Sequence, residues 1–257
     1  MRNIVTIAKR DVQSSFSSMI AYVVVAIFLA VVGYFFFSFT YLYARFSFNI
    51  GSDPSLQKGF NQMDFIIRPL FMNLSIVMLL VIPILTMRSL AEEKKQGTAE
   101  LLFTYPLTNA EIVLGKYAGL VSVFLIMMLP TLIPVGLLAL FGASVPLTSL
   151  LICYLGALLL GISFCSLGLF ASSLSENQTI AAVFSFGSLL LFWLVGWAEE
   201  FVHTKWLGAF LKNVSLVTHY QNFISGLVNT NDLVYYGLFT AFFLYLTYRV
   251  VEKRTWR

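Results

Sequence analysis

The residues best placed to do chemistry in this chain lie in one segment, residues 88–116. Four charges follow one another there, Glu92, Glu93, Lys94 and Lys95. A fifth, Glu100, precedes three large apolar side chains, Leu101, Leu102 and Phe103. Exposed acids and bases form ion pairs, and an apolar tip beside them would fill a groove on another protein. The segment therefore favours docking of a partner over catalysis. A solvated loop whose apolar residues dip back into a membrane is the alternative.

No catalytic or metal-binding pattern accompanies these charges. Gly115-Lys116 has Ala110 five positions before the glycine, so the glycine-rich loop that cradles a nucleotide phosphate is missing. His203 and His219 have no partners at metal-ligand spacing. The sequence contains no Gly-x-Ser-x-Gly elbow and no His-Glu-x-x-His pair. It predicts neither an enzyme nor an ATPase, and no cofactor or metal held by this chain.

Composition places the chain in a membrane. Of its 257 residues, 59% are hydrophobic and 11% are charged, and the mean hydropathy is +0.85. A soluble chain of this size could not bury so much apolar surface around one core. An ordinary cytosolic enzyme, a disordered tail and a secreted disulfide scaffold are therefore excluded. Cys153 and Cys165 lie in an uncharged stretch and are interpreted as small buried hydrophobic residues.

Gaps between charges delimit six membrane spans, because a helix needs about 20 apolar residues to cross the hydrocarbon core. The predicted spans are residues 19–43, 69–87, 118–141, 147–171, 177–198 and 233–248. The last is short, but its tyrosines suit the two membrane interfaces. The fold class is therefore all-α, a polytopic membrane protein with six transmembrane helices in a single domain over residues 1–257.

The basic residues predict the orientation of these spans. Six spans put both termini on the same side, and placing that side in the cytoplasm makes most of the 16 lysines and arginines cytoplasmic. The positive-inside rule therefore favours cytoplasmic termini. The first span does not resemble a cleaved signal peptide, because its apolar region is too long and no small-residue cleavage site follows it.

Two segments outside the spans are also partly apolar. Residues 1–18 place Ile4, then Ile7 or Ala8, and then Val12 at helical spacing. This spacing predicts an amphipathic helix in the inner membrane interface, or else a plain charged lead-in to the first span. Residues 199–232 are about half apolar with glycine breaks, which predicts two short helices that enter the outer leaflet and return. An amphipathic helix lying flat on the outer surface is the alternative.

Turn signals divide the charged segment into helices. Gly97 can end the helix that continues from the second span, and Thr98 can cap a short helix over residues 99–104. Pro106 prevents that helix from continuing. A Thr-x-x-Glu capping box at residues 108–111 starts the next helix. The result is a short helix between two turns at the cytoplasmic face.

Three runs of this segment resemble the hallmark of ABC (ATP-binding cassette) transporter type-2 permeases. They are RSLAEEKKQGTAELL at 88–102, YPLT at 105–108 and EIVLGK at 111–116. The run IAKRD at 7–11 before a first span is also typical of that family, as is a half-apolar outer segment before the last span. The resemblance extends over essentially the whole chain. It is closest to the gliding-motility-associated permease branch, which includes many proteins with no link to gliding.

The resemblance implies the type-2 ABC exporter fold, in which the N-terminal amphipathic helix is a connecting helix, residues 99–104 form a coupling helix and residues 199–232 form an outer re-entrant pair. Two permease copies, as homodimer or heterodimer, would form the membrane path. Two cytoplasmic ATP-binding subunits, which bind ATP and Mg, would dock on them. An accessory membrane protein with a large outer domain often accompanies that branch. The expected location is the bacterial plasma (inner) membrane, in contact with the lipid bilayer and with no nucleic acid.

The function implied is a permease subunit that couples ATP hydrolysis by a separate subunit to export or to mechanical signalling. The expected ATPase-coupling interface consists of Lys9, Arg10, Glu92, Glu93, Lys94, Lys95, Gly97, Thr98, Glu100, Leu101, Leu102, Phe103 and Pro106. Lys9 and Arg10 would pair with the acidic members of this set or with the ATPase. Two alternatives stay open. One is a secondary carrier or channel, for which no inverted repeat is evident, and the other is a membrane anchor of an extracytoplasmic complex that moves no substrate.

Overall fold

A computed structural model describes residues 2–50, 61–97, 108–140, 145–201 and 205–255. Six helical segments within this part are long and apolar enough to cross a membrane. They are Met19–Phe48, Met63–Lys95, Asn109–Leu140, Leu147–Leu174, Gln178–Gly196 and Thr230–Lys253. The predicted all-α fold with six spans is therefore confirmed.

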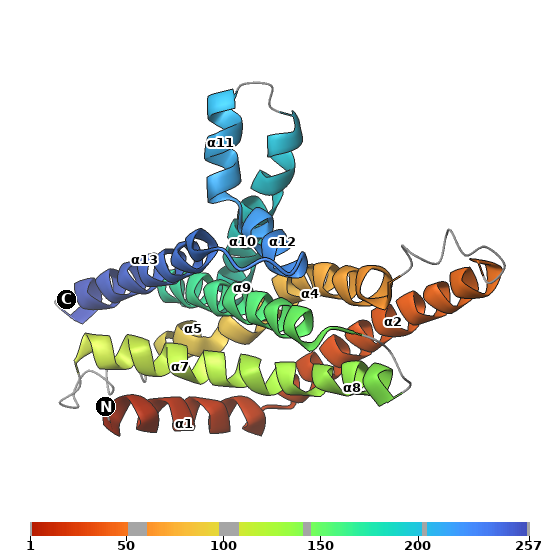
Figure 1. Cartoon of the computed structure of the whole chain (residues 1–257). Coiled ribbons are helices and arrows are strands. Elements are labelled where there is room, and N and C mark those ends of the chain that lie inside the picture. Colours follow the sequence, from red (N-terminus) through yellow and green to blue (C-terminus); the bar gives the residue numbers. More distant parts are fainter. Residues whose placement is uncertain (1, 51–60, 98–107, 141–144, 202–204, 256–257) are drawn as a thin grey trace.

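Most spans are single helices, but the second and third are interrupted (Figure 1). A π-helical turn, η1, opens the second span, and a 3₁₀ turn, η2, divides the third at Pro130. The elements in chain order are α1 (Arg2–Ser17), α2 (Met19–Ile50), η1 (Met63–Ile67), α4 (Arg68–Thr86), α5 (Arg88–Lys95), α7 (Asn109–Met128), η2 (Leu129–Thr131), α8 (Leu132–Leu140), α9 (Leu147–Leu174), α10 (Gln178–Phe201), α11 (Lys205–Val214), α12 (Leu216–Ile224) and α13 (Thr230–Thr255).

The helices extend beyond the predicted spans because a charged residue does not by itself end a helix. α13 continues through Arg249 and Glu252, whose side chains pair at 2.8 Å. α5 ends just before Gly97, which has a φ of +70° that a glycine adopts without strain. The capping box is confirmed, since Thr108 accepts from the Glu111 N–H and the Glu111 carboxylate accepts from the Thr108 N–H.

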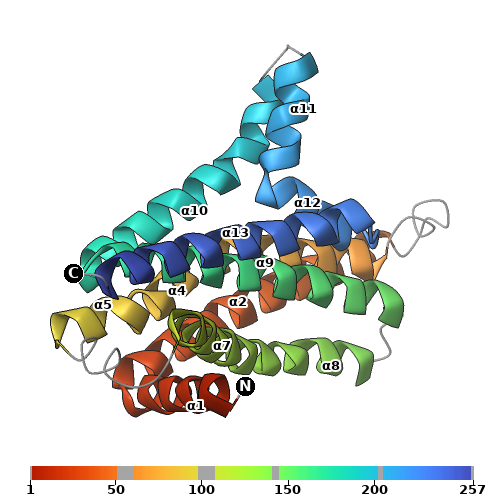
Figure 2. The same cartoon turned by 90° about the vertical axis from the view of Figure 1, so that its left-hand side faces the viewer.

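α9 is the central helix of the bundle and contacts α4, α7, α10, α12 and α13 (Figures 1 and 2). Its glycines lie where neighbouring side chains come closest. A Cβ added at Gly156 would lie 2.5 Å from Cβ of Phe223 on α12, and Gly161 faces the ring of Phe124 on α7. Small residues let membrane helices approach closely without a polar driving force. Cys153 and Cys165 of the same helix are buried free thiols, as expected.

Within residues 199–232 the structure describes two short helices, α11 and α12. α11 projects away from the bundle together with the end of α10 (Figures 1 and 2). α12 is packed against α9, α10 and α4, and Tyr220 on it donates to the Phe71 carbonyl at 2.8 Å. The Tyr236 hydroxyl of α13 donates to the Leu216 carbonyl at 2.9 Å. These buried hydrogen bonds anchor α12 to the spanning helices.

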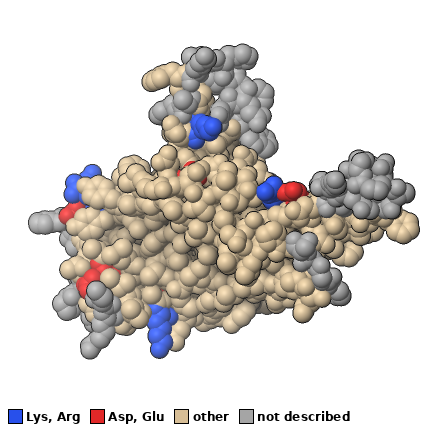
Figure 3. Space-filling model, viewed as in Figure 1, with Lys and Arg blue, Asp and Glu red and all other residues tan. Residues whose placement is uncertain are grey.

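The surface between the ends of the bundle carries few charges. On the face seen in Figure 3, lysines, arginines and acids are scattered over a broad uncharged surface. Large apolar side chains are exposed along the spans, among them Tyr34 and Phe37 on α2 and Leu191 on α10. Such a surface is expected of helices in contact with lipid.

Gly156→Ala tests the close contact between α9 and α12. The added methyl would overlap a Cβ atom that is fixed to the α12 backbone, so we expect the free energy of unfolding to fall by about 1–3 kcal/mol. Gly187→Ala in α10 is the matched control, because nothing lies within 4 Å of its added Cβ. That control should keep or slightly raise the melting temperature in detergent. An equal melting temperature for both variants would contradict the packing described.

Candidate functional site

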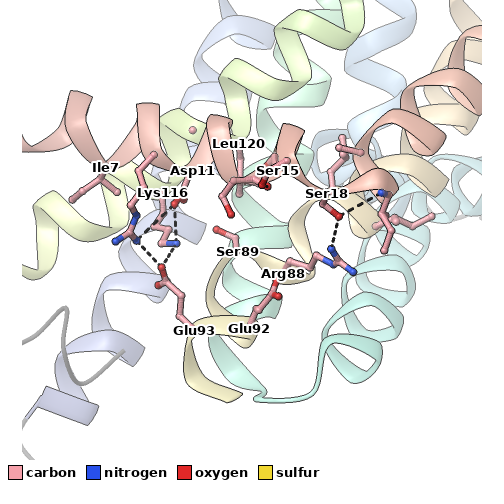
Figure 4. Close-up of a pocket in the computed structure, with 18 of the residues that line it drawn as sticks. Ile7, Asp11, Ser15, Ser18, Arg88, Ser89, Glu92, Glu93, Lys116 and Leu120 are labelled. Carbon is pink, nitrogen blue, oxygen red and sulfur yellow. Dashed lines mark hydrogen bonds and ion pairs between the residues drawn. The ribbon is translucent and has the colours of Figure 1, made fainter. Parts of the chain in front are cut away.

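Four charged side chains from the three helices α1, α5 and α7 meet beside the contact between α1 and α7 (Figure 4). Nζ of Lys116 on α7 is 3.1 Å from Oδ1 of Asp11 on α1 and 2.6 Å from Oε1 of Glu93 on α5. Nη2 of Arg10 donates to the same Glu93 oxygen at 2.8 Å. This four-charge cluster, Arg10, Asp11, Glu93 and Lys116, joins the N-terminal helix to the end of the second span and the start of the third.

Lys116 is the buried member on which the four-charge cluster is centred. Its side chain is 3% exposed, whereas Asp11 and Glu93 are 16% and 17% exposed and Arg10 is 54% exposed. Burial raises the pKa of the Asp11 carboxyl above its ordinary value, although the ammonium of Lys116 acts in the opposite direction. Desolvation is therefore the larger effect on Asp11, and its charge depends on the lysine beside it.

Two glycines of α7 allow α1 to approach closely enough for this contact. A Cβ added at Gly115 would lie 2.8 Å from Cβ of Ile7, and one at Gly119 would lie 2.9 Å from Cβ of Asp11. Gly115 and Gly119 are four residues apart on α7, and Ile7 and Asp11 are four residues apart on α1. Each pair therefore lies on one face of its own helix. Asp11 and Lys116 are not among the site residues that the sequence predicts. The signal that could have found them is the Gly-x-x-x-Gly spacing at 115–119 in an apolar helix.

The described members of the predicted coupling set are only partly brought together. Arg10 forms an ion pair with Glu93, an acidic member of the set. Lys9 is exposed, and so are Lys95 and Gly97 at the end of α5. Lys94 turns toward α9, where its ammonium donates to the Ser173 carbonyl.

The other members of the set lie outside the described residues. They are Thr98, Glu100, Leu101, Leu102, Phe103 and Pro106. The coupling helix over residues 99–104 therefore stays a prediction, and so does the role of the whole set.

A cavity of about 1000 Å³ adjoins the four-charge cluster and lies between α1, α2, α4–α5 and α7. Glu92 lines it and accepts a hydrogen bond from Gln96 Nε2 at 3.3 Å. Arg88 lines it as well and donates from Nη1 to the Ser18 hydroxyl at 3.0 Å. Among the residues that the structure describes, no group of three His, Cys, Asp or Glu side chains could hold a metal.

A second polar cluster joins α12 to the start of α13. Nδ1 of His219 is 2.6 Å from Oδ1 of Asp232, and Asn222 Nδ2 donates to the other carboxylate oxygen at 3.0 Å. The His219 ring also stacks on Tyr235, with centroids 4.1 Å apart. The sequence offered no partner for His219 because Asp232 comes from the following helix. With the Asp232 side chain only 3% exposed, these buried bonds hold α12 and α13 together.

The model of a family described as ABC-2 family transporter protein matches residues 46–249 of this chain. The matched range includes Glu93, Lys116 and residues 98–107, and begins after Arg10 and Asp11. No curated protein matches the chain.

Lys116→Ala tests the role of the buried ammonium. It would leave Asp11 and Glu93 facing each other without Lys116, so we expect a loss of about 3–5 kcal/mol of folding free energy. Removal of Lys116 takes away a group that lowers the pKa of Asp11 and leaves Glu93, which raises it. The folded variant would then take up a proton more readily, and its deficit should shrink as the pH falls from 7.5 to 5.5.

Melting temperatures of the purified variants at the two pH values measure this effect. Asp11→Asn is the matched control, since the amide can still accept a hydrogen bond from Lys116 and Glu93 still balances the buried ammonium. It should change the melting temperature much less than Lys116→Ala. A pH-independent deficit, or equal losses in both variants, would show that the four-charge cluster does not depend on Lys116.

Proposed function

The chain belongs to the ABC-2 family of transporter proteins, and we propose that it is the membrane-spanning permease subunit of an ATP-binding cassette transporter. In this proposal a separate cytoplasmic subunit binds ATP and Mg and hydrolyses the nucleotide. The permease then converts the movement of that subunit into export or mechanical signalling across the plasma membrane. The proposal rests on the way α1, α5 and α7 are joined by the four-charge cluster.

α5 and α7 are the helices that lead into and out of residues 98–107, where the ATPase would dock. α5 continues the second span, since the Met87 N–H bonds to the Pro83 carbonyl at 3.0 Å and α5 begins at the next residue. α7 opens the third span. A displacement of residues 98–107 would therefore reach two spans directly and would reach α1 through the four-charge cluster.

A buried serine connects the same joint to the central helix. The Ser172 hydroxyl of α9 accepts from the N–H groups of Leu90 and Ala91 at 3.0 and 3.1 Å, and it donates to the Met87 carbonyl at 3.0 Å. These bonds hold the start of α5 against α9. Movement of α5 would thus be transmitted to the helix that contacts most of the bundle.

The composition of the central helix α9 supports a secondary carrier less well than an ATP-driven permease. α9 contains no aspartate, glutamate, lysine, arginine or histidine. Carriers driven by protons or ions use ionisable groups at membrane depth, so an external energy source fits this helix better. A membrane anchor that moves no substrate would use the same contacts, and the ATPase partner distinguishes it from a permease.

The assembly and orientation are part of the proposal. The N- and C-termini lie at the same end of the bundle as the end of α5 and the start of α7 (Figure 1). We assign this end to the cytoplasm of a bacterial cell, in agreement with the distribution of basic residues. A second permease copy would complete the membrane path, and an accessory membrane protein would supply a large outer domain, as in the gliding-motility-associated branch.

Two substitutions in residues 98–107, one that reverses a charge and one that replaces an apolar side chain with a charged one, test the docking of an ATPase. Glu100→Lys and Leu101→Asp should each reduce the amount of ATP-binding subunit that co-purifies with the permease about tenfold or more, because a buried anchor at an interface is worth about 2 kcal/mol. Lys212→Glu on α11 is the matched charge-reversal control at the opposite end. Normal co-purification with both variants, at unchanged melting temperature, would contradict the proposal.

Cysteine labelling tests the orientation. Lys9 and Lys212 are both exposed, on α1 and α11, while the native thiols Cys153 and Cys165 are buried. A membrane-impermeant maleimide should label Lys212→Cys in intact cells and Lys9→Cys only after permeabilisation. Unsubstituted protein should stay unlabelled in both cases. The reverse pattern would place the termini outside and would overturn the proposed docking side.

A further inference from the structure

The cavity beside the four-charge cluster has an apolar wall and a polar wall (Figure 4). The apolar wall comes from the adjoining ends of α2 and α4 and consists of Ile20, Ala21, Val24, Ile84 and Leu85. Ile20 and Ile84 are also 41% and 40% exposed, so this wall continues onto the lipid-facing surface. The polar wall contains five serine hydroxyls, from Ser14, Ser15, Ser17, Ser18 and Ser89. A ligand that fills the cavity must therefore be amphipathic.

Arg88 presents hydrogen-bond donors that the described residues do not use. Nη1 donates to Ser18, but Nε is buried and has no acceptor within the described part of the chain. The Ser89 hydroxyl next to it is likewise buried and unpartnered there. No described carboxylate forms an ion pair with Arg88. Buried donors without acceptors cost free energy, and a guanidinium bonds phosphate oxygens especially well.

Glu92 supplies the opposite charge on the same wall. It lies four residues after Arg88 on α5, so the two side chains share a helix face with Cβ atoms about 5–6 Å apart. Among described partners its carboxylate accepts only from Gln96 Nε2, at 3.3 Å. The other charges that line the cavity, Arg10, Asp11, Glu93 and Lys116, neutralise one another in the four-charge cluster. The guanidinium of Arg88 and the carboxylate of Glu92 are therefore the charged groups available to bind a ligand.

We propose that this cavity binds a phosphoethanolamine headgroup, supplied by phosphatidylethanolamine of the surrounding leaflet. The phosphate accepts from Arg88 and the nearby serine hydroxyls, and the primary ammonium donates to Glu92. The acyl chains leave between α2 and α4 along the apolar wall. An anionic lipid lacks the ammonium, so its net negative charge would lie near the Glu92 carboxylate and be repelled by it. A choline headgroup is positively charged but has no N–H to donate to that carboxylate. The inference does not depend on an ATPase partner, so its failure would leave the proposed function intact.

Native mass spectrometry of the full-length chain in mild detergent tests the site. Phosphatidylethanolamine, phosphatidylcholine and phosphatidylglycerol with identical acyl chains are titrated, and the apparent affinities are compared within each variant. Unsubstituted protein should bind phosphatidylethanolamine about tenfold more tightly than the other two lipids, the ratio expected for one charge-assisted hydrogen bond. Glycerophosphoethanolamine, which has the same headgroup without acyl chains, should bind far more weakly.

Two substitutions separate the two halves of the headgroup. Arg88→Gln should weaken binding of all three lipids about tenfold, because each carries a phosphate. Glu92→Gln should weaken phosphatidylethanolamine alone and thereby remove its advantage over phosphatidylcholine. Lys253→Gln, which removes an exposed cation of α13 outside the cavity, is the control and should change none of the affinities.

The selectivity ratio within one variant keeps the test independent of stability, since a loss of folding would weaken all lipids alike. Equal affinities of the unsubstituted protein for the three lipids would overturn the proposal. Retained selectivity in Glu92→Gln would also overturn it. Equally tight binding of glycerophosphoethanolamine would show that the site takes a soluble phosphoethanolamine and not a lipid.

Discussion

A lysine ammonium that is almost fully buried must be neutralised by its neighbours, and Lys116 receives that neutralisation from two other helices. Asp11 belongs to α1 and Glu93 to α5, so the charge balance of one side chain sets the relative position of three elements. Because Lys116 binds acids of both α1 and α5, its contacts hold the three helices together at this end of the bundle. The segment between α5 and α7, where an ATPase would dock, is therefore attached to a joint with little freedom to move independently.

Close approach of the helices makes this joint possible. Gly115 and Gly119 let α1 lie directly on α7, and Gly156 does the same for α12 on α9. In a membrane these contacts are favoured by packing and by buried hydrogen bonds more than by the hydrophobic effect. Ser172 is an example, since one hydroxyl satisfies two backbone N–H groups and one carbonyl at the start of α5. Such contacts allow a displacement at one end to be carried along rigid helices to the other.

The two ends of the bundle are held together by different means. At one end charged groups from distant parts of the chain meet beside an amphipathic cavity, and at the other Asp232 binds His219 and Asn222 within about 13 residues of sequence. The first arrangement links the N-terminal helix to the second and third spans, while the second closes a local connection between α12 and α13. The charged end therefore connects distant parts of the chain, whereas the Asp232 cluster connects two neighbouring helices.

The sequence by itself determined the class of protein, the number of spans and the capping box at Thr108 and Glu111, because hydropathy and helix capping act over a few neighbouring residues. It also singled out Arg10 and Glu93 and offered the acidic residues of the set as partners for Arg10, but it did not single out Asp11 or Lys116. Lys116 looked like an ordinary basic residue at a span end, and His219 looked unpartnered. Only the tertiary structure decided these pairings, since they join residues up to 105 positions apart in the chain. The same holds for the cavity at Arg88 and Glu92, whose walls come from four helical regions. The periodicity of the sequence indicates which face of a helix is apolar, but it does not indicate against which helix that face packs. The pairing of helix faces depends on close contacts that form only in the folded chain.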